Sequence, residues 1–178
     1  CLGRRFTVSG EGYGGEGSIE PEDMQAMPEW ATLLASAALC SDSRIHQNGP
    51  VSELIGDPTE GALLALVQKS GVDAEQLIEQ YPRIAEIPFD SAHKFMATFH
   101  HDGSVVRMWL KGAPDVLIAR SSRHVSAGGA AVLDDAARAI FAAENAALAD
   151  NAMRVLALAG REIKSSEFDP AGDLMRWS

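Results

Sequence analysis

The chain has 178 residues, 46% of them hydrophobic and 22% charged, which is enough for about one domain of roughly 150 residues with a buried core. It carries 15 Lys and Arg against 25 Asp and Glu, a formal net charge of -10, which argues against a general electrostatic grip on nucleic acid. No run approaches the roughly 18 apolar residues of a membrane-spanning helix. The chain opens without an initiator Met or a signal peptide, so we expect a piece of a longer protein.

The first elements are a short strand and a helix. Residues 5–9 predict the strand, and the Gly-rich, acidic stretch 10–23 predicts a mobile loop. Residues 29–40 are helical in composition, and Pro28 suits the first turn. A polar loop is expected over residues 41–56.

The next helix has the clearest boundaries in the chain. Asp57 is a suitable N-cap, Pro58 fits the first helical position, and Glu60 falls three residues after the cap. Gly71 ends the helix shortly after Lys69.

Residues 94–111 predict a β-hairpin, because Asp102-Gly103 is a preferred two-residue turn between alternating apolar residues. With that turn, the numbers of opposed residues sum to 205. One face is then wholly apolar and should be the core side. It pairs Phe95, Ala97 and Phe99 with Leu110, Met108 and Val106. The same register places Lys94 opposite Lys111, which destabilises a sheet unless an anion or solvent lies between them.

The last elements are a helix over residues 134–151 and a buried strand over residues 154–159. The predicted apolar stripe of the helix contains Leu133, Ala137, Ile140 and Leu148. The mixed order of strands and helices, with a hairpin at the centre, indicates an α+β fold.

Four segments carry a family resemblance: G-D-P-T-E-G-A-L at 56–63, P-F-D-S-A-H-K-F-M at 88–96, L-K-G-A-P-D at 110–115 and R-V-L-A-L-A at 154–159. In this order they resemble the nucleotide-binding (N) domain of P-type cation-transporting ATPases, most closely the calcium-pump-like branch. The resemblance implies an α+β fold in which helices flank a central antiparallel sheet. It also implies a single domain over 1–178, with a strand and mobile loop over 1–27 and a tail toward the phosphorylation domain over 162–178.

The resemblance implies a set of nucleotide-binding residues. Phe89 would stack on the adenine ring, Lys111 would line the adenine pocket, and Lys94 would lie toward the ribose and phosphates. Glu60 would accept a hydrogen bond from the adenine side, and Met96 belongs to the same set.

Two further residues complete this set. Gly112 would let the backbone approach the ligand closely, and Arg154 would reach the phosphates where this domain meets its neighbour. The chain departs from the family pattern at Ser91, where many members have Arg, and at Asp115, where Glu is commoner.

Each residue also has an interpretation that needs no ligand. Glu60 occupies the position of a capping-box glutamate, and Phe89 after a proline could be a core residue. Lys94, Lys111 and Arg154 could be solvated ends of strands. These interpretations explain the residues singly but not their joint order.

For function, the resemblance implies an ATP-driven cation transporter, with calcium as the first candidate ion. The fragment would bind ATP and ADP without hydrolysing ATP, because it contains no D-K-T-G-T motif. Mg²⁺ would bind mainly with the phosphorylation domain. The fragment would be a cytoplasmic part of an integral plasma- or inner-membrane protein and would touch neither the membrane nor nucleic acid. Its partners would be the phosphorylation and actuator domains of the same polypeptide.

Two other functions stay open at this point. One is a cytoplasmic protein-interaction module without a nucleotide site. The other is a dinucleotide-dependent oxidoreductase, because residues 10–15 satisfy G-x-G-x-x-G. Glutamates surround that motif and no βαβ unit follows it, whereas a phosphate loop should be electropositive.

Overall fold

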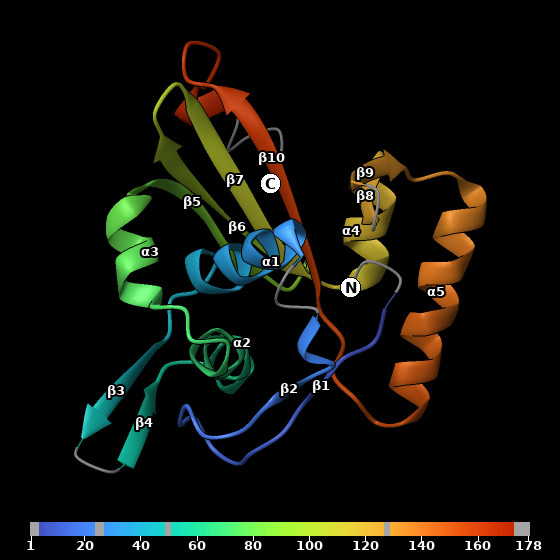
Figure 1. Cartoon of the computed structure of the whole chain (residues 1–178). Helices are drawn as coiled ribbons and strands as arrows, with labels where there is room; N and C mark the ends of the chain where they lie inside the picture. The colour runs from blue at the N-terminus through green and yellow to red at the C-terminus, as the bar shows by residue number, and fades with distance from the viewer. Residues whose placement is uncertain (1–3, 24–26, 49–50, 127–128, 173–178) are drawn as a thin grey trace. The chain divides into compact units, whose positions relative to one another are not determined.

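The computed structural model describes residues 4–23, 27–48, 51–126 and 129–172. The chain divides into two compact units. The N-terminal unit ends at Pro82 and the C-terminal unit begins at Arg83. Figure 1 labels their elements in chain order.

The N-terminal unit consists of three helices and two small hairpins among its described residues. Its elements are β1 (Thr7–Val8), β2 (Ile19–Glu20), α1 (Pro28–Leu39), β3 (Arg44–Asn48), β4 (Val51–Ile55), α2 (Pro58–Lys69) and α3 (Ala74–Gln80). Helix α1 packs against α2 and α3, and the strands pair as β1-β2 and β3-β4. Both predicted helices are confirmed.

The polar loop predicted over residues 41–56 is wrong, because most of it forms the β3-β4 hairpin. The alternation of apolar and polar residues in its strands is weak. Among its larger apolar residues, only Ile45 and Leu54 are half-buried. Val51 and Ile55 are 62% and 60% exposed. Strand β3 packs on α2, so a tertiary contact stabilises the hairpin where local periodicity is poor.

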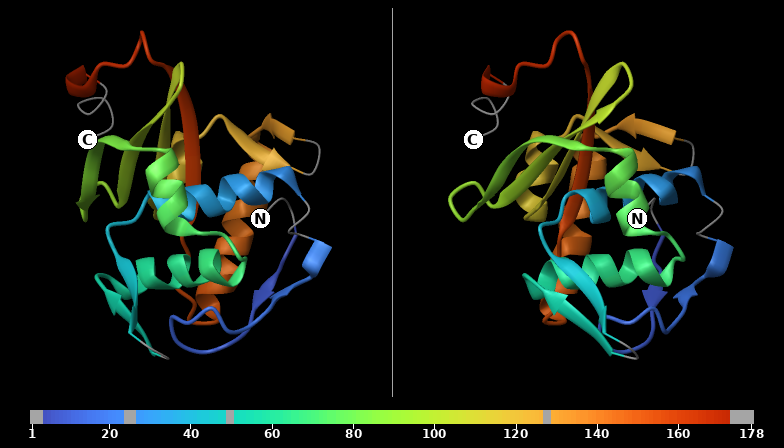
Figure 2. Two further views of the ribbon diagram at one scale, coloured as in Figure 1. Left: turned by 60° about the vertical axis from the view of Figure 1, so that its left-hand side comes forward. Right: turned by 90° about the vertical axis from the view of Figure 1, so that its left-hand side faces the viewer.

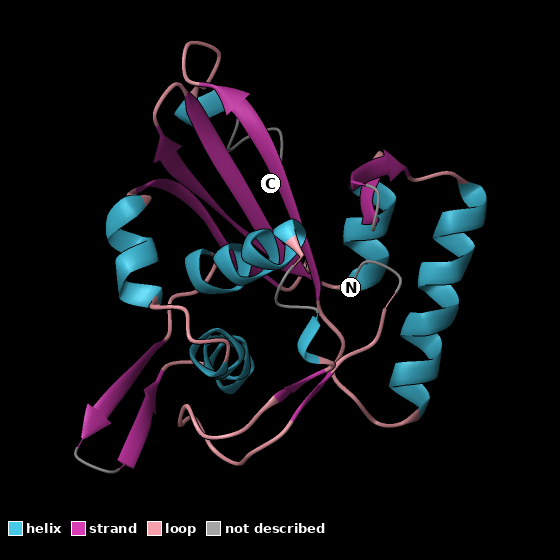
Figure 3. Ribbon diagram, viewed as in Figure 1, coloured by secondary structure: helices cyan, strands magenta, loops and turns pink. Residues whose placement is uncertain are grey.

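The C-terminal unit is built on a four-stranded antiparallel sheet with the order β10-β7-β6-β5. Its elements are β5 (Arg83–Asp90), β6 (Phe95–Asp102), β7 (Val105–Gly112), α4 (Pro114–Arg120), β8 (Arg123–Ser126), β9 (Gly129–Val132), α5 (Asp135–Asp150) and β10 (Ala157–Lys164). Figure 2 shows the four strands from two further sides, and Figure 3 separates strands from helices by colour. This sheet is the central antiparallel sheet of the predicted α+β fold.

The predicted apolar face of the hairpin is confirmed as the core of this unit. Its six residues, Phe95, Ala97, Phe99, Val106, Met108 and Leu110, are each 5% exposed or less. Leu117 of α4 and Ile163 of β10 pack against them. Removing this apolar surface from water supplies the main driving force for folding the unit.

The predicted register of the hairpin is wrong by two residues. The turn is Gly103-Ser104, closed by the pair of Asp102 with Val105, so the numbers of opposed residues sum to 207. Gly103 has φ +60°, which favours glycine at this turn position. A shift of two residues keeps every side chain on its predicted face. It also removes the predicted pair of lysines, because Met96 lies opposite Lys111.

Two elements near the C-terminus differ from their predicted form. Strand β10 begins at Ala157 rather than at Arg154 and continues to Lys164, so it includes the first residues of the expected tail. Helix α5 has the predicted position, and Asp134 caps it, but Ile140 of the expected apolar stripe is 65% exposed. Among the described residues, no helix combines the length and apolar character that crossing a bilayer requires.

Candidate functional site

Most of the predicted site residues lie at one end of the four-stranded sheet. Figure 1 labels its strands β10, β7, β6 and β5. Strand β5 ends there at Asp90, β6 begins at Phe95, β7 ends at Gly112, and β10 begins at Ala157. Because neighbouring strands are antiparallel, these four strand ends lie together. The predicted residues at this end of the sheet are Phe89, Lys94, Met96, Lys111 and Gly112.

Phe89 is a solvent-exposed aromatic residue at this end of the sheet. The residue is 64% exposed to solvent. The regular pairing of β5 with β6 is interrupted here, between the pair of Ile87 with Ala97 and the next pair. The interpretation of Phe89 as a core residue is therefore wrong. An exposed ring offers a flat apolar face on which a base can stack.

Lys94 lies in the tight turn between β5 and β6. The carboxylate of Asp90 accepts a hydrogen bond of 2.6 Å from the N–H of Ala92. The carbonyl oxygen of Asp90 accepts a bond of 2.7 Å from the N–H of Lys94. Lys94 is exposed and has φ +59°, a left-handed conformation that residues with a side chain seldom adopt. The turn thus presents a lysine from a fixed backbone.

Lys111 and Met96 form a cross-strand pair on the sheet face opposite the core. Lys111 is 7% exposed and Met96 is 1% exposed. Within the part of the chain that the structure describes, no other Lys or Arg is buried. The interpretation of Lys111 as a solvated strand end is therefore wrong. Directly opposed positions let the lysine methylenes pack along the thioether.

The K-G-A-P-D motif has a clear structural role at the end of β7. Gly112 lies opposite Phe95. The N–H of Ala113 donates a hydrogen bond of 2.9 Å to the carbonyl oxygen of Lys94. Ala113 is also the N-cap of α4, and Pro114 follows at the start of the helix. The motif therefore ties the end of β7 to the Lys94 turn and starts a helix at once.

Arg154 precedes the sheet rather than lying in it. It is an exposed residue of the connection between α5 and β10, three residues before Ala157. Three residues span at most about 11 Å. Arg154 therefore lies near the same end of the sheet, although the strand predicted to begin at Arg154 begins later.

Glu60 belongs to the N-terminal unit, where its carboxylate holds a neighbouring loop. One oxygen, Oε2, accepts bonds of 2.8 and 2.6 Å from the N–H and hydroxyl of Ser43, and of 3.0 Å from the N–H of Asp42. The hydroxyl of Ser41 donates a further bond of 3.3 Å. A capping box would require Glu60 to bind the N–H of Asp57, but that N–H donates to the hydroxyl of Ser43. The capping-box interpretation is wrong.

Asp57 performs the capping that the sequence predicts. Its carboxylate accepts bonds of 2.8 Å from the N–H of Thr59 and 3.3 Å from the N–H of Glu60. Hydrogen bonding by the Thr59 side chain, the largest cause, lowers the pKa of Asp57, and the two N–H groups lower it further. The cap is therefore strongest when Asp57 is ionised.

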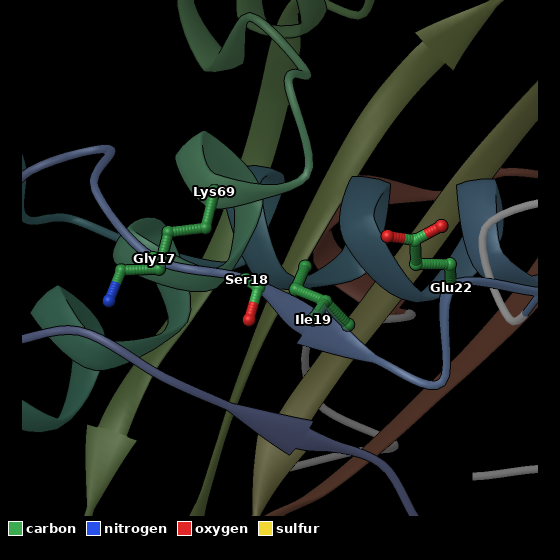
Figure 4. A pocket seen from close by; sticks show the side chains of 5 residues that line it. All are labelled: Gly17, Ser18, Ile19, Glu22 and Lys69. Carbon is green, nitrogen blue, oxygen red and sulfur yellow. The ribbon is translucent and has the colours of Figure 1, made fainter.

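The Gly-rich motif over 10–15 belongs to a loop between two antiparallel strands, β1 and β2. The N–H of Ser9 donates a bond of 2.9 Å to the carbonyl oxygen of Ser18, and Lys69 Nζ donates a bond of 2.6 Å to that of Ser9. A dinucleotide motif should instead join a strand to a helix. A pocket of about 390 Å³ lies beside this loop. Figure 4 shows Lys69 and Glu22 on opposite sides of it. Its lining residues are Gly17, Ser18, Ile19, Glu22 and Lys69.

Three relatives illustrate what the chain resembles. It is 38% identical over 93% of its length to a calcium-transporting ATPase of Bacillus subtilis (strain 168). It is 36% identical over 85% of its length to calcium-transporting ATPase 1 of Lactococcus lactis subsp. lactis (strain IL1403). It is 32% identical over 88% of its length to calcium-transporting ATPase type 2C member 1 of Bos taurus. The matched parts span only 19%, 17% and 17% of these relatives.

The family model described as the cytoplasmic domain N of P-type ATPases matches residues 29–176. That range includes all four motifs and every strand and helix from α2 to β10. The chain therefore belongs to the family of cytoplasmic N domains of P-type ATPases.

Proposed function

We propose that this domain binds ATP and ADP at the end of the sheet that carries Phe89. The observation that carries the proposal is the 64% exposure of this ring beside the Lys94 turn. Stacking of a base on an aromatic ring contributes about 1–3 kcal/mol. An exposed phenylalanine with a lysine five residues later suits a ligand that has both an aromatic base and an anionic tail.

The remaining residues receive roles that fit their positions. Lys111 and Met96 line the adenine pocket, where the buried lysine stem and the thioether offer apolar contact. Lys94 and Arg154 approach the ribose and phosphates, since both are exposed cations at this end of the sheet. Cationic side chains form strong, charge-assisted hydrogen bonds with phosphate oxygens.

For Glu60, which belongs to the N-terminal unit, the family resemblance alone carries the proposal that it accepts a hydrogen bond from the adenine 6-amino group. The test uses ATP and inosine triphosphate, because inosine has a 6-oxo group that cannot donate. If Glu60 has this role, Glu60→Ala weakens ATP binding more than inosine triphosphate binding. Equal weakening of both nucleotides would mean that Glu60 acts only by holding the Ser41–Ser43 loop.

The parent protein is proposed to be an ATP-driven cation transporter of the plasma or inner membrane, with this domain in the cytoplasm. Calcium is the first candidate ion. Phosphoryl transfer depends on alignment and electrostatics. This domain would anchor the base and the ribose. The γ-phosphate and Mg²⁺ would bind at the phosphorylation domain of the same polypeptide. The actuator domain of that polypeptide would be the second partner. The isolated domain would bind nucleotide without hydrolysing it, and Mg²⁺ would change its affinity little.

A titration followed by amide NMR tests the proposal. ATP and ADP should bind with similar affinity and shift resonances of Phe89, Lys94 and Lys111. Shifts confined to residues 10–15 would favour a dinucleotide site, and no shifts would favour a protein-interaction module. A large preference for Mg-ATP over ADP would contradict the assigned orientation of the nucleotide.

A further inference from the structure

We propose that Gly112 is a positioning residue, which serves nucleotide binding through the backbone of Lys94 rather than by contact with the ligand. The inference rests on the proposed nucleotide site. It concerns the contact between the end of β7 and the turn that leads into β6. Gly112, Ala113 and Lys94 form this contact, which we call the Lys94 clamp.

The first part of the clamp is steric. A Cβ atom on Gly112 would lie 2.5 Å from the carbonyl oxygen of Lys94, 2.6 Å from Cβ of Phe95 and 2.7 Å from Cα of Phe95. Opposed residues in antiparallel strands usually keep their Cβ atoms about 4.5–5.5 Å apart. None of the three contacted atoms belongs to the flexible end of a side chain. Any side chain at position 112 must therefore displace the backbone of the neighbouring strand.

The second part of the clamp is a pair of hydrogen bonds on either side of Lys94. Its N–H donates to the carbonyl oxygen of Asp90 at 2.7 Å, and its carbonyl oxygen accepts from the N–H of Ala113 at 2.9 Å. Between these bonds Lys94 holds φ +59°. Such a conformation persists when the surrounding structure fixes it. The clamp therefore determines the direction in which the Cα–Cβ bond of Lys94 points.

A side chain at position 112 would break this arrangement. Displacing the Lys94 carbonyl would lengthen its bond to Ala113 and allow Lys94 to return to negative φ, which residues with a side chain prefer. The ammonium group would then point elsewhere. Because Lys94 is assigned to the ribose and phosphates, the loss should appear in the binding of the phosphate tail and not in that of the base.

The test compares Gly112→Ala, Lys94→Ala and the double variant in the 178-residue chain, with ATP and adenosine as ligands in calorimetric titrations. Each single variant should weaken ATP binding about tenfold, as expected for losing a hydrogen bond to a charged group. The double variant should be no weaker than Lys94→Ala, and adenosine binding should change less than about twofold. Equal losses for adenosine and ATP, or losses that multiply in the double variant, would overturn the proposal.

Gly103→Ala is the matched control. Gly103 has positive φ, as Lys94 does, and lies in the turn at the other end of β6, but a Cβ there meets no atom within 4 Å. It should strain the backbone and leave ATP binding unchanged. A tenfold loss of ATP affinity in this variant would show that backbone strain anywhere in the hairpin is sufficient, and the clamp would be refuted.

Ala113→Pro probes the clamp if Gly112→Ala fails to fold. Ala113 has φ -62° and ψ 131°, which suit a proline that precedes Pro114. The variant removes the N–H that binds Lys94, and it should weaken ATP but not adenosine. Unchanged ATP binding would overturn the proposal. Failure of the unaltered chain to bind either ligand would instead overturn the proposed function.

Discussion

The two units of the chain differ most in their charge. The residues up to Pro82 include 4 Lys and Arg against 13 Asp and Glu, whereas those from Arg83 include 11 against 12. The first unit thus holds -9 of the formal -10. The net charge of the whole chain hides a nearly neutral unit that carries six of the seven candidate residues. An anionic ligand is repelled less by a unit in which Lys and Arg side chains offset the negative charge of Asp and Glu.

The sharpest way to test this contrast is Phe89→Ala in the C-terminal unit. It should weaken ATP and ADP binding by about 1–3 kcal/mol, or about five- to 150-fold. The domain should stay folded because the ring is 64% exposed. Calorimetric titration and thermal unfolding measure the two effects separately. Phe99→Ala is the control for loss of a core aromatic residue. Removing this fully buried ring should lower the free energy of unfolding by about 3–5 kcal/mol. Unchanged nucleotide affinity in Phe89→Ala would remove the central argument for the site.

In the acidic unit, Glu60 should matter for stability. Glu60→Ala leaves the donors of Ser41, Asp42 and Ser43 without this acceptor, at a cost of about 1–3 kcal/mol. Ser43→Ala removes fewer bonds and should cost less. Urea unfolding of both variants compares them. A larger loss in Ser43→Ala than in Glu60→Ala would contradict the view that the carboxylate organises this loop.

The two units also contain comparable helix caps. Asp57 caps α2 and Asp134 caps α5, each with its carboxylate. Replacing either residue by Ala should cost about 0.5–2 kcal/mol. Hydrogen exchange should rise in α2 for Asp57→Ala and in α5 for Asp134→Ala. Increased exchange in both helices from one substitution would show that the units do not open separately.

The Asp57 cap also gives a pH dependence. Its pKa is lower in the folded chain than the ordinary value of 3.8. A lowered folded pKa contributes stability above the unfolded pKa, and that contribution is lost as pH falls through the folded pKa. The difference in stability between the unaltered chain and Asp57→Asn should therefore shrink below about pH 4. Because Asp57 is largely exposed, salt and solvent reduce this effect.

The smallest expected effect concerns the backbone of Lys94. Lys94→Gly should raise the stability of the ligand-free domain by up to about 1 kcal/mol, because glycine accepts positive φ without strain. ATP binding should weaken at the same time, since the ammonium group is lost. Thermal unfolding without ligand measures the first effect. A marked loss of stability would mean that the lysine side chain itself supports the turn.

The faces of the central hairpin could be predicted from the sequence, whereas its register could not. Alternation with period two places Phe95, Phe99 and Met108 on one face for any register that differs by two residues. Whether Asp102-Gly103 or Gly103-Ser104 forms the two-residue turn depends on the backbone geometry at the turn. The hydrophobic pattern contains no information about that geometry. The predicted opposition of Lys94 and Lys111 depended on that choice, and Met96 lies opposite Lys111 instead.

The candidate site shows a similar division. Resemblance to the family identifies the residues, but the exposure of Phe89 and the partners of Glu60 depend on tertiary structure. Glu60 has the spacing of a capping box, and no local signal reveals that Ser43 occupies the N–H of Asp57 instead. The close approach at Gly112 is likewise invisible until two strands are aligned.

Strand β6 has one turn at each end, and they should respond very differently to extra residues. At the distal turn a Cβ on Gly103 would meet no atom within 4 Å, and Ser104 accepts one hydrogen bond, from the N–H of Ser165. The turn at Lys94 is instead held by close contact with Gly112 and by a hydrogen bond from Ala113. Strand β6 is eight residues long, so its two ends lie about 24 Å apart. A fluorescent reporter or epitope inserted at the distal tip would therefore leave the ligand end undisturbed, so this tip is the natural place to attach a probe to the domain.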